Sequence, residues 1–196
     1  MLDMPRLELG RLATHSDIVA LPDQLVGEII DDHLWTSPRP SPRHALAAGQ
    51  LMATLGNGVR GGGGGRGGWW ILPEPEVHIG HHVVVPDLAG WRRERLPRLP
   101  DTAYVDLAPD WLCEVLSPST ERLDREKKLP VYLQAGVGHV WLLDPLARTL
   151  DVLGRTGRSW SRLASHAGGD IVCVEPFREV DLSLTRLWDT SPHDDH

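Results

Sequence analysis

Residues 111–145 have the sequence WLCEVLSPSTERLDREKKLPVYLQAGVGHVWLLDP, and this stretch decides the fold. It begins with an apolar run at 111–116 that is typical of a strand and is interrupted only by Glu114. A helix follows from SPST at 117–120, with Pro118 near its first position, and Pro130 is expected to kink or split it. HVWLLD at 139–144 is again typical of a strand. The stretch therefore predicts a strand, a helix and a second strand.

Outside this stretch the sequence predicts mainly strands. A hairpin is expected over residues 24–36, with an acidic turn at Asp31 and Asp32. A helix with one buried face is expected over 42–55, ending at Gly56. Short strands are predicted at 69–72, 76–79, 82–91 and 149–154. Strands with two main helices packed on them indicate an α/β or α+β fold.

The chain is expected to form a single domain over residues 1–188, with a core at about 14–155 and a polar C-terminal tail at 189–196. GGGGGRGG at 61–68 lacks the Gly-Lys-Ser/Thr that ends a phosphate-binding loop, so we interpret it as a flexible connector.

The composition excludes several classes of protein. The 196 residues are 41% hydrophobic and 24% charged, which is typical of a globular protein. No apolar run approaches the ~18 residues of a membrane-spanning helix. The first ten residues carry acids and a proline where a secretion signal needs basic and then apolar residues. We therefore expect a cytoplasmic location and no membrane partner.

The charge of the chain is −7 at pH 7, whereas proteins that coat DNA non-specifically are usually basic. A nuclease with one local basic groove stays compatible with this charge, because electrostatic fields are local at cellular ionic strength. Of the 20 basic residues only two are Lys, the adjacent Lys127 and Lys128. An Arg bias of this size reflects a GC-rich genome, which makes the surviving lysine pair a candidate for a specific role.

Three carboxylates are embedded in apolar strands. Glu28 lies in LVGEII, Asp87 ends VVVPD, and Glu114 lies in WLCEVL. Strand alternation could turn any one of them to solvent, but Glu114 has apolar neighbours on both sides and is expected to be buried. If such groups converge, they form an oxygen site suited to Mg²⁺ or Mn²⁺. A metal there activates water for attack on a phosphodiester.

Several segments resemble the Uma-type family of endonucleases in the PD-(D/E)XK nuclease superfamily. The resemblance covers roughly residues 14–155, and its most specific part is 111–145. Its motifs are PD at 86–87, CEVLSPST at 113–120, DREKKLPVY at 124–132, AGV at 135–137 and VWLLDP at 140–145. It implies a restriction-endonuclease-like α/β fold, with a central mixed sheet flanked by helices and an added N-terminal hairpin.

The resemblance also implies site residues. Asp87 and Glu114 correspond to the metal-binding acids of the superfamily, and Glu28 to an upstream acid that assists them. The superfamily lysine normally follows the second acid by two residues, where this chain has Leu116. In the Uma-type pattern the lysine has moved to the next helix, which points to Lys128. The alternative for Lys128 is an ordinary helix-surface ion pair with Asp124, four residues earlier.

Other residues have weaker signals. His78, His81 and His82 suggest a transition-metal site, but a strand turn brings at most two of them to one side, and surface histidines are the commoner outcome. WRRERLPR at 91–98 is either a solvated loop or a phosphate-contacting edge beside the cleft, through Arg92, Arg93 and Arg95. Tyr132 either packs or contacts substrate.

The expected function is Mg²⁺-dependent or Mn²⁺-dependent hydrolysis of DNA phosphodiester bonds. Two alternatives stay open: an inactive binding or regulatory module on the same fold, and a metal-dependent hydrolase of small phosphoesters. A homodimer is expected, because short apolar edge strands and several Trp would otherwise be exposed.

Overall fold

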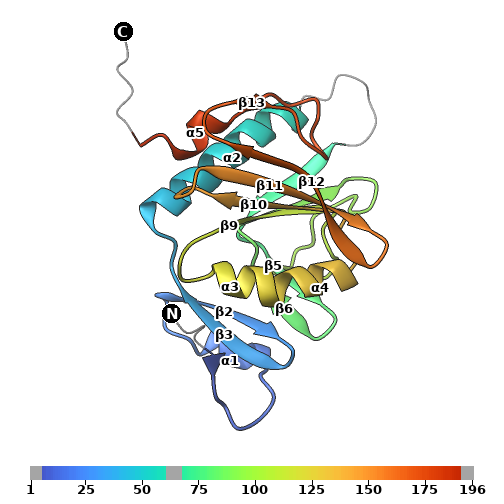
Figure 1. The fold of residues 1–196 in the computed structure, drawn as a ribbon. Helices are drawn as coiled ribbons and strands as arrows, with labels where there is room; N and C mark the ends of the chain where they lie inside the picture. Colours follow the sequence, from blue (N-terminus) through green and yellow to red (C-terminus); the bar gives the residue numbers. More distant parts are fainter. Residues whose placement is uncertain (1–5, 61–67, 191–196) are drawn as a thin grey trace.

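The structure, a computed structural model, describes residues 6–60 and 68–190. Its architecture is α+β, with two six-stranded mixed sheets and a two-stranded sheet (Figure 1). The inner sheet has the order β12 (Ser159–Ala167), β11 (Thr149–Thr156), β10 (His139–Asp144), β9 (Trp111–Val115), β7 (Leu88–Arg92) and β4 (Trp69–Pro73). The outer sheet has the order β1 (Arg6–Leu7), β3 (His33–Pro38), β2 (Leu25–Ile30), β6 (His82–Val84), β5 (Glu76–Ile79) and β8 (Tyr104–Val105). Strands β13 (Ile171–Val172) and β14 (Leu182–Ser183) pair with each other.

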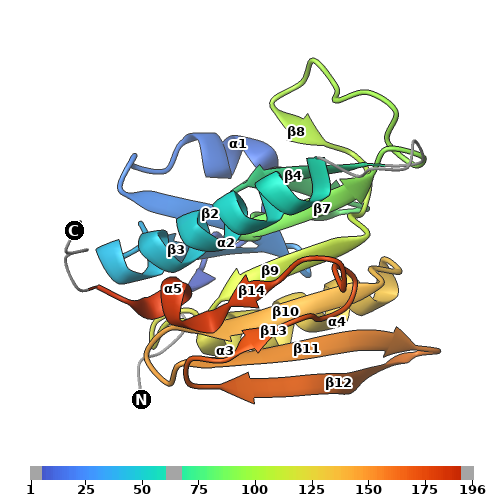
Figure 2. The same cartoon turned by 90° about the horizontal axis from the view of Figure 1, so that it is seen from above.

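Helices lie on both faces of the inner sheet (Figures 1 and 2). On one face lies α2, with the C-terminal segment packed beside it; on the other face lies the helical segment of residues 121–134, next to the outer sheet. The helices are α1 (His15–Val19), α2 (Pro42–Arg60), α3 (Glu121–Leu123), the π-helical turn η1 (Asp124–Lys128), α4 (Leu129–Gln134) and α5 (Leu184–Trp188).

Strand alternation in β9 divides its side chains between two hydrophobic cores. Trp111, Cys113 and Val115 pack with α2 and the C-terminal segment. Leu112 packs on the opposite face with α4 and the outer sheet. Glu114 shares the face of Leu112, so a carboxylate enters the layer between the two large sheets.

The pairing of β7 with β9 sets the geometry of the candidate site. The two strands are antiparallel, with Leu88 opposite Cys113 and Ala89 opposite Leu112. Asp87 directly precedes β7, and its Oδ2 accepts a hydrogen bond from the backbone N–H of Val115, the residue after Glu114. The fold therefore places Asp87 beside the end of β9 that carries Glu114.

The predicted hairpin is confirmed as β2 and β3, which pair from Leu25 opposite Pro38 to Ile30 opposite His33. Both turn residues have positive φ, 51° at Asp31 and 61° at Asp32. This conformation is the one that a two-residue hairpin turn requires, and Asp tolerates it better than most residues.

Two predictions about elements are wrong in detail. The helix expected to end at Gly56 continues to Arg60, since buried packing of residues such as Leu51 and Leu55 outweighs the ~1 kcal/mol cost of a helical glycine. The strand expected over 82–91 is divided between the two sheets, because Pro86 has no N–H to continue the pairing. The predicted α/β or α+β fold class with a mixed sheet flanked by helices is confirmed, and the added hairpin is part of a second large sheet.

The helix after β9 contains a π-helical turn. Residues 124–128 form η1, and Pro130 follows within the first turn of α4, where its missing N–H is tolerated. A π turn is rare and is frequent at functional sites.

Parts of two predictions lie outside the described residues: most of the connector at 61–68 and residues 191–196 of the polar tail. Within the described residues, no helix is long and apolar enough to cross a membrane.

Candidate active site

A pocket of about 250 Å³ lies where β2, the start of α2, the β6–β7 linker, β9 and residues 117–128 meet. Among its lining residues are six ionisable side chains that are buried or nearly so: Glu28, His44, Asp87, Glu114, Asp124 and Lys128. The structure therefore brings together the four residues that the sequence indicates, namely Glu28, Asp87, Glu114 and Lys128, and adds two more.

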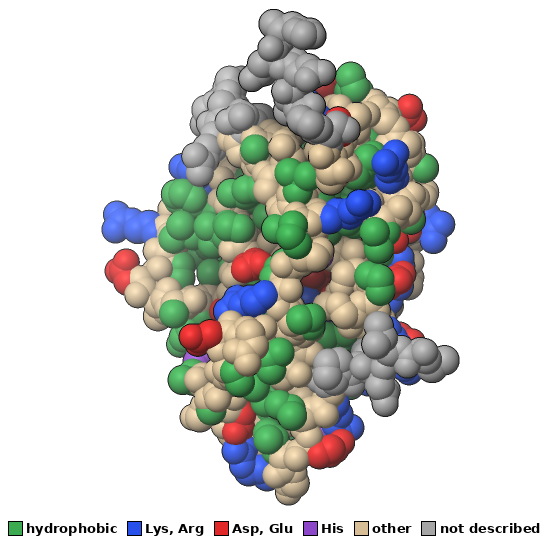
Figure 3. Space-filling model, turned by 90° about the vertical axis from the view of Figure 1, so that its left-hand side faces the viewer, with side chains coloured by type: hydrophobic (Ala, Val, Ile, Leu, Met, Phe, Trp, Pro, Cys, Tyr) green, Lys and Arg blue, Asp and Glu red, His purple; other side chains and the backbone are tan. Residues whose placement is uncertain are grey.

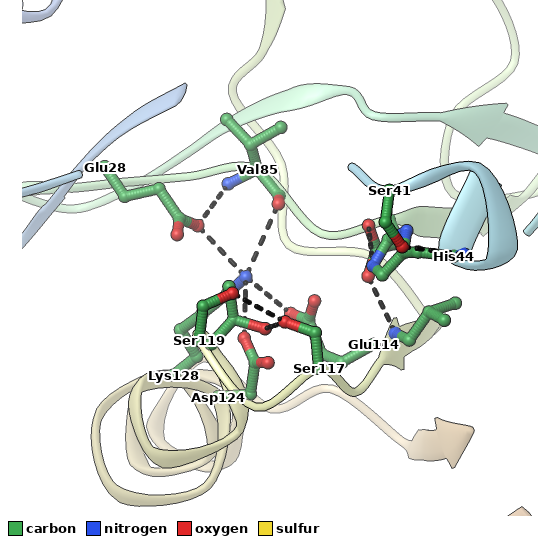
Figure 4. A network of polar contacts seen from close by, with 12 residues as sticks. Glu28, Ser41, His44, Val85, Glu114, Ser117, Ser119, Asp124 and Lys128 are labelled. Atoms are coloured by element: carbon green, nitrogen blue, oxygen red, sulfur yellow. Dashed lines mark hydrogen bonds and ion pairs between the residues drawn. The ribbon is translucent and has the colours of Figure 1, made fainter. Parts of the chain in front are cut away.

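The ammonium of Lys128 is the centre of this group (Figure 4). Its Nζ lies 2.9 Å from Oε1 of Glu114, 3.1 Å from Oε1 of Glu28 and 3.4 Å from Oδ1 of Asp124. It also donates a hydrogen bond to the carbonyl oxygen of Val85 at 3.4 Å. One cation is thus held by acids from β2, β9 and its own helical turn.

Lys128 stays charged in this surrounding. Burial by itself acts to lower the pKa of its ammonium, but the nearby carboxylates, led by Glu114 and Glu28, outweigh burial and raise the pKa well above the usual value. A lysine held in the protonated form is a fixed positive charge and has no lone pair to accept a proton. Its chemistry at this site is therefore electrostatic.

Glu114 lies at the bottom of the pocket and is 1% exposed. Its Oε1 accepts a hydrogen bond from the hydroxyl of Tyr132 at 2.6 Å, in addition to the contact with Lys128. Burial raises the pKa of Glu114 well above its usual value, although Lys128 acts in the opposite direction. A second cation close to Glu114 would therefore favour its ionised form.

Asp87 is the most exposed of the four acids, with 17% of its side chain accessible. Its Oδ2 accepts a hydrogen bond from the backbone N–H of Val115 at 2.7 Å, which links the β6–β7 linker to β9. Its Oδ1 lies 3.3 Å from Nε2 of His44, in the first turn of α2. Burial acts to lower the pKa of His44, but the hydrogen bond and charge of Asp87 outweigh it and raise the pKa.

Glu28 is oriented by a backbone hydrogen bond from the β6–β7 linker. Its Oε1 accepts a hydrogen bond from the backbone N–H of Val85 at 2.7 Å and lies beside Lys128. Glu28, Asp124 and Oε1 of Glu114 all contact the ammonium, so the donors considered for another cation are Asp87 and the second oxygen of Glu114.

The donor set of the pocket fits a hard divalent cation. Asp87, just before β7, and Glu114, on the neighbouring strand β9, supply oxygens to the same pocket. Mg²⁺ in proteins is usually bound by one or two carboxylates and keeps several waters. Within the described residues, the groups of three acidic or histidine side chains with ligand atoms within 4.8 Å lie elsewhere. A cation in the pocket would therefore take protein ligands from Asp87 and Glu114 and its remaining ligands from water.

Sequence reasoning missed His44 and assigned Asp124 to the helix surface. Asp124 and Lys128 are both 3% exposed, so the surface ion-pair alternative is wrong. The sequence does carry a signal for Asp124, because Asp124 and Leu123 precede Lys128 and Lys127 by one helical turn. Only the fold shows that this face of the helix is covered. His44 has no comparable signal, since a histidine at the start of a helix is common.

The candidate nucleic-acid contacts lie elsewhere. Arg92 and Arg93 stack over Trp69 and Trp70, with guanidinium carbons 4.7 and 3.9 Å from the ring centroids, at the opposite end of β7 from Asp87. Arg95 pairs with Asp110 at 2.9 Å. Among the described residues that line the acidic pocket none of these three arginines occurs, and their contact with nucleic acid stays a prediction.

Tyr132 was expected either to pack or to contact substrate. It is fully buried, so its side chain packs inside the molecule. Two of the three histidines of HIGHH are less exposed than the sequence predicts, whereas His81 is exposed as expected. His82 is buried, and its Nδ1 accepts a hydrogen bond from the backbone N–H of Asp31 at 3.2 Å. His78 is partly buried beside Glu76.

Comparisons with known proteins agree with this arrangement. The family described as "Uma2: Putative restriction endonuclease" matches residues 17–186. A crystal structure of "a putative nuclease belonging to DUF820 from Anabaena variabilis" aligns with a TM-score of 0.71 and 24% identity, over 90% of this chain and 97% of that chain. The structural likeness shows a shared fold. No curated protein matches the chain.

A first prediction concerns Asp124. Burial, opposed by Lys128, raises its pKa to about 6. An acid with a higher pKa in the folded than in the unfolded chain binds extra protons on folding, so its effect on the folded state becomes less favourable as pH rises through that value. In EDTA we expect Asp124→Asn to melt at a higher temperature than the wild type at pH 8, with a difference that shrinks below a pH of about 6.

Thermal unfolding followed by circular dichroism measures this difference. Glu126→Gln is the matched control, because Glu126 lies on the same turn, is exposed and pairs with Arg122. A difference between Asp124→Asn and wild type that does not change with pH would contradict the assignment.

Proposed function

The chain belongs to the Uma2 family, described as "Putative restriction endonuclease", and from this membership we propose that it hydrolyses DNA phosphodiester bonds with Mg²⁺ or Mn²⁺ as cofactor. The family match confirms the resemblance that the motifs indicate. The observation that carries the proposal is the pair Asp87 and Glu114 in one pocket, where Asp87 accepts a hydrogen bond from the N–H of Val115, next to Glu114, and the ammonium of Lys128 lies 2.9 Å from Glu114.

In this proposal Asp87 and Glu114 hold the metal. The metal, when bound, supplies positive charge that polarises the phosphate and lowers the pKa of water. Val115 orients Asp87 through its backbone N–H, and Tyr132 orients Glu114 through its hydroxyl. Both carboxylates are therefore fixed before any ligand arrives, which reduces the cost of organising the site.

Lys128 supplies a second, fixed positive charge. Its high pKa suits it to stabilise negative charge on the scissile phosphate and excludes it as a general base at neutral pH. Glu28 and Asp124 hold it in place and are positioning residues in this proposal. His44 plays the same part for Asp87, which it contacts through Nε2.

The distribution of charge on the surface around the site affects how strongly a nucleic acid would be attracted to it. Figure 3 shows acidic and basic side chains intermixed near the middle of one face of the molecule, with apolar side chains around them. Intermixed charge gives weak long-range attraction for a polyanion. The proposed enzyme therefore depends on the metal and Lys128 for contact with phosphate, rather than on a broad basic surface. The homodimer and the cytoplasmic location stay predictions.

The direct test is cleavage of supercoiled plasmid. We expect the wild-type chain to nick or linearise the plasmid with Mg²⁺ or Mn²⁺ and to lose this activity in EDTA. Binding of the plasmid without cleavage under any metal condition would favour the inactive module. Cleavage of mononucleotide esters alone would favour the small-phosphoester hydrolase.

The metal ligands are tested separately from activity. Asp87→Asn and Glu114→Gln should each abolish Mn²⁺ binding in titration calorimetry, while the chain stays folded by circular dichroism. Glu114→Gln should also raise the melting temperature without metal, because burial disfavours the ionised carboxylate. Glu74→Gln is the matched control, since Glu74 lines the same pocket but is exposed. Unchanged Mn²⁺ affinity in the first two variants would remove this site from consideration.

Lys128 is tested by a change that keeps its charge. Lys128→Arg places a longer, planar cation among the acids, and a misplacement of ~1 Å near reacting atoms can cost ~10²-fold in rate. We expect plasmid cleavage under single-turnover conditions to fall at least about 10²-fold. The larger side chain should also cost about 1–3 kcal/mol of stability, so rates are compared well below the melting temperature.

Lys127→Arg is the control for this change. Lys127 is partly exposed, with its Nζ 5.7 Å from the ring centroid of Trp35, where an arginine keeps the same cation–π contact. Its cleavage rate should be close to that of the wild type. Equal cleavage by both arginine variants would contradict the proposed role of Lys128.

A further inference from the structure

A second group of metal-ligating side chains lies on the outer sheet, outside the acidic pocket. It consists of His15, the first residue of α1, and of Glu76 and His78 on β5. Glu76 and His78 are two positions apart in a strand, so their side chains share one face of the sheet. The helix α1 lies over this sheet next to β2 and brings His15 to the same place.

The ligand atoms of the three residues are already close together. Oε1 of Glu76 lies 3.0 Å from Nε2 of His15 and 2.7 Å from Nε2 of His78, and all three atoms lie within 4.8 Å of one another. Around a tetrahedral Zn²⁺ with bonds of about 2.0–2.1 Å, neighbouring ligand atoms are roughly 3.3 Å apart. Small side-chain movements therefore suffice to accommodate the ion.

We propose that His15, Glu76 and His78 form a binding site for a divalent transition metal ion of the Zn²⁺ class, separate from the Asp87–Glu114 pair. Two imidazole nitrogens and one carboxylate oxygen favour Zn²⁺ and related ions over Mg²⁺, which prefers oxygen ligands. His15 is 47% exposed, so one side of the site is open to solvent. Three protein ligands then leave a fourth position for water.

One of the two rings is held in place before a metal arrives. His78 stacks on Tyr104 of β8, with ring centroids 3.9 Å apart and an interplanar angle of 4°. This contact directs Nε2 toward Glu76. Without metal, the group is satisfied by hydrogen bonds from the two histidines to a single carboxylate oxygen, which is the competing explanation for the arrangement.

The other histidine group, Asp31, His81 and His82, is less suited to metal. The Nδ1 of His82 already accepts the backbone N–H of Asp31, and the rings of His81 and His82 lie against each other with centroids 4.0 Å apart. It serves as an internal control for the proposal.

The proposed ion would hold α1 in place beside a second pocket, which adjoins the acidic pocket. Glu76 and Ile18 of α1 line this second pocket of about 310 Å³, which shares Val26, Arg39 and Val85 with the acidic pocket. A metal bridge from His15 to β5 would therefore fix one wall of the approach to that pocket.

Zinc affinity of the untagged full chain tests the proposal, measured by competition with a chromophoric chelator in excess Mg²⁺. The wild type and Asp87→Asn should both bind one Zn²⁺ at this site, so the result is independent of the proposed nuclease function. His15→Ala and His78→Ala should each weaken this binding at least about tenfold. Zn²⁺ should raise the melting temperature of the wild type but not of His15→Ala.

Two controls remove other sources of zinc binding. His81→Ala tests the neighbouring group, and the double variant His193→Ala, His196→Ala removes the two histidines of the C-terminal sequence HDDH. Both should keep the affinity of the wild type.

The proposal is overturned if the wild type does not compete with the chelator, or if His15→Ala and His78→Ala bind Zn²⁺ as tightly as the wild type. Circular dichroism of metal-free His15→Ala should match the wild type, because His15 is half-exposed and its loss leaves no cavity.

Discussion

The ammonium of Lys128 is the charge on which the centre of this molecule depends. Three carboxylates from β2, β9 and η1 lie within 3.4 Å of it, all of them nearly inaccessible to solvent. Buried carboxylates without a partner are strongly destabilising, so this layer between the two sheets can hold them only because one lysine is shared among them. Even with it, burial and the charges of neighbouring acids keep the pKa values of Glu114 and Asp124 raised. The acids of this layer outnumber the one lysine among them, which leaves a surplus of negative charge.

This surplus of negative charge connects the stability of the folded chain with the proposed binding of a metal ion. A pocket that holds more acids than its own cations neutralise is strained without a ligand and favours the binding of a further cation. The surrounding structure keeps the acids from relaxing apart, because the N–H of Val115 holds the carboxylate of Asp87 and the hydroxyl of Tyr132 holds that of Glu114. The π turn η1 places Asp124 and Lys128 in the same buried layer.

The sequence predicted the parts of this arrangement that follow from local patterns. Apolar runs interrupted by single acids indicated Glu28, Asp87 and Glu114. The scarcity of lysine marked the pair Lys127 and Lys128, of which the family resemblance pointed to Lys128. It did not predict Asp124 as a buried group, because an acid four residues before a lysine is usually a surface pair, and burial of that face depends on the outer sheet. Arg92 and Arg93 follow Asp87 closely in sequence, yet one strand length separates them from the pocket. The division of residues 82–91 between two sheets is likewise a tertiary effect that no local pattern reports.

The central claim is that Asp87 and Glu114 together form a metal site beside the ammonium of Lys128. A crystal structure of the wild-type chain soaked in Mn²⁺, with anomalous scattering recorded at the manganese edge, tests it most directly. The account predicts an anomalous peak in contact with carboxylate oxygens of both Asp87 and Glu114, with Lys128 still bound to Glu28 and Asp124. A well-ordered pocket with no peak between these two carboxylates would contradict it.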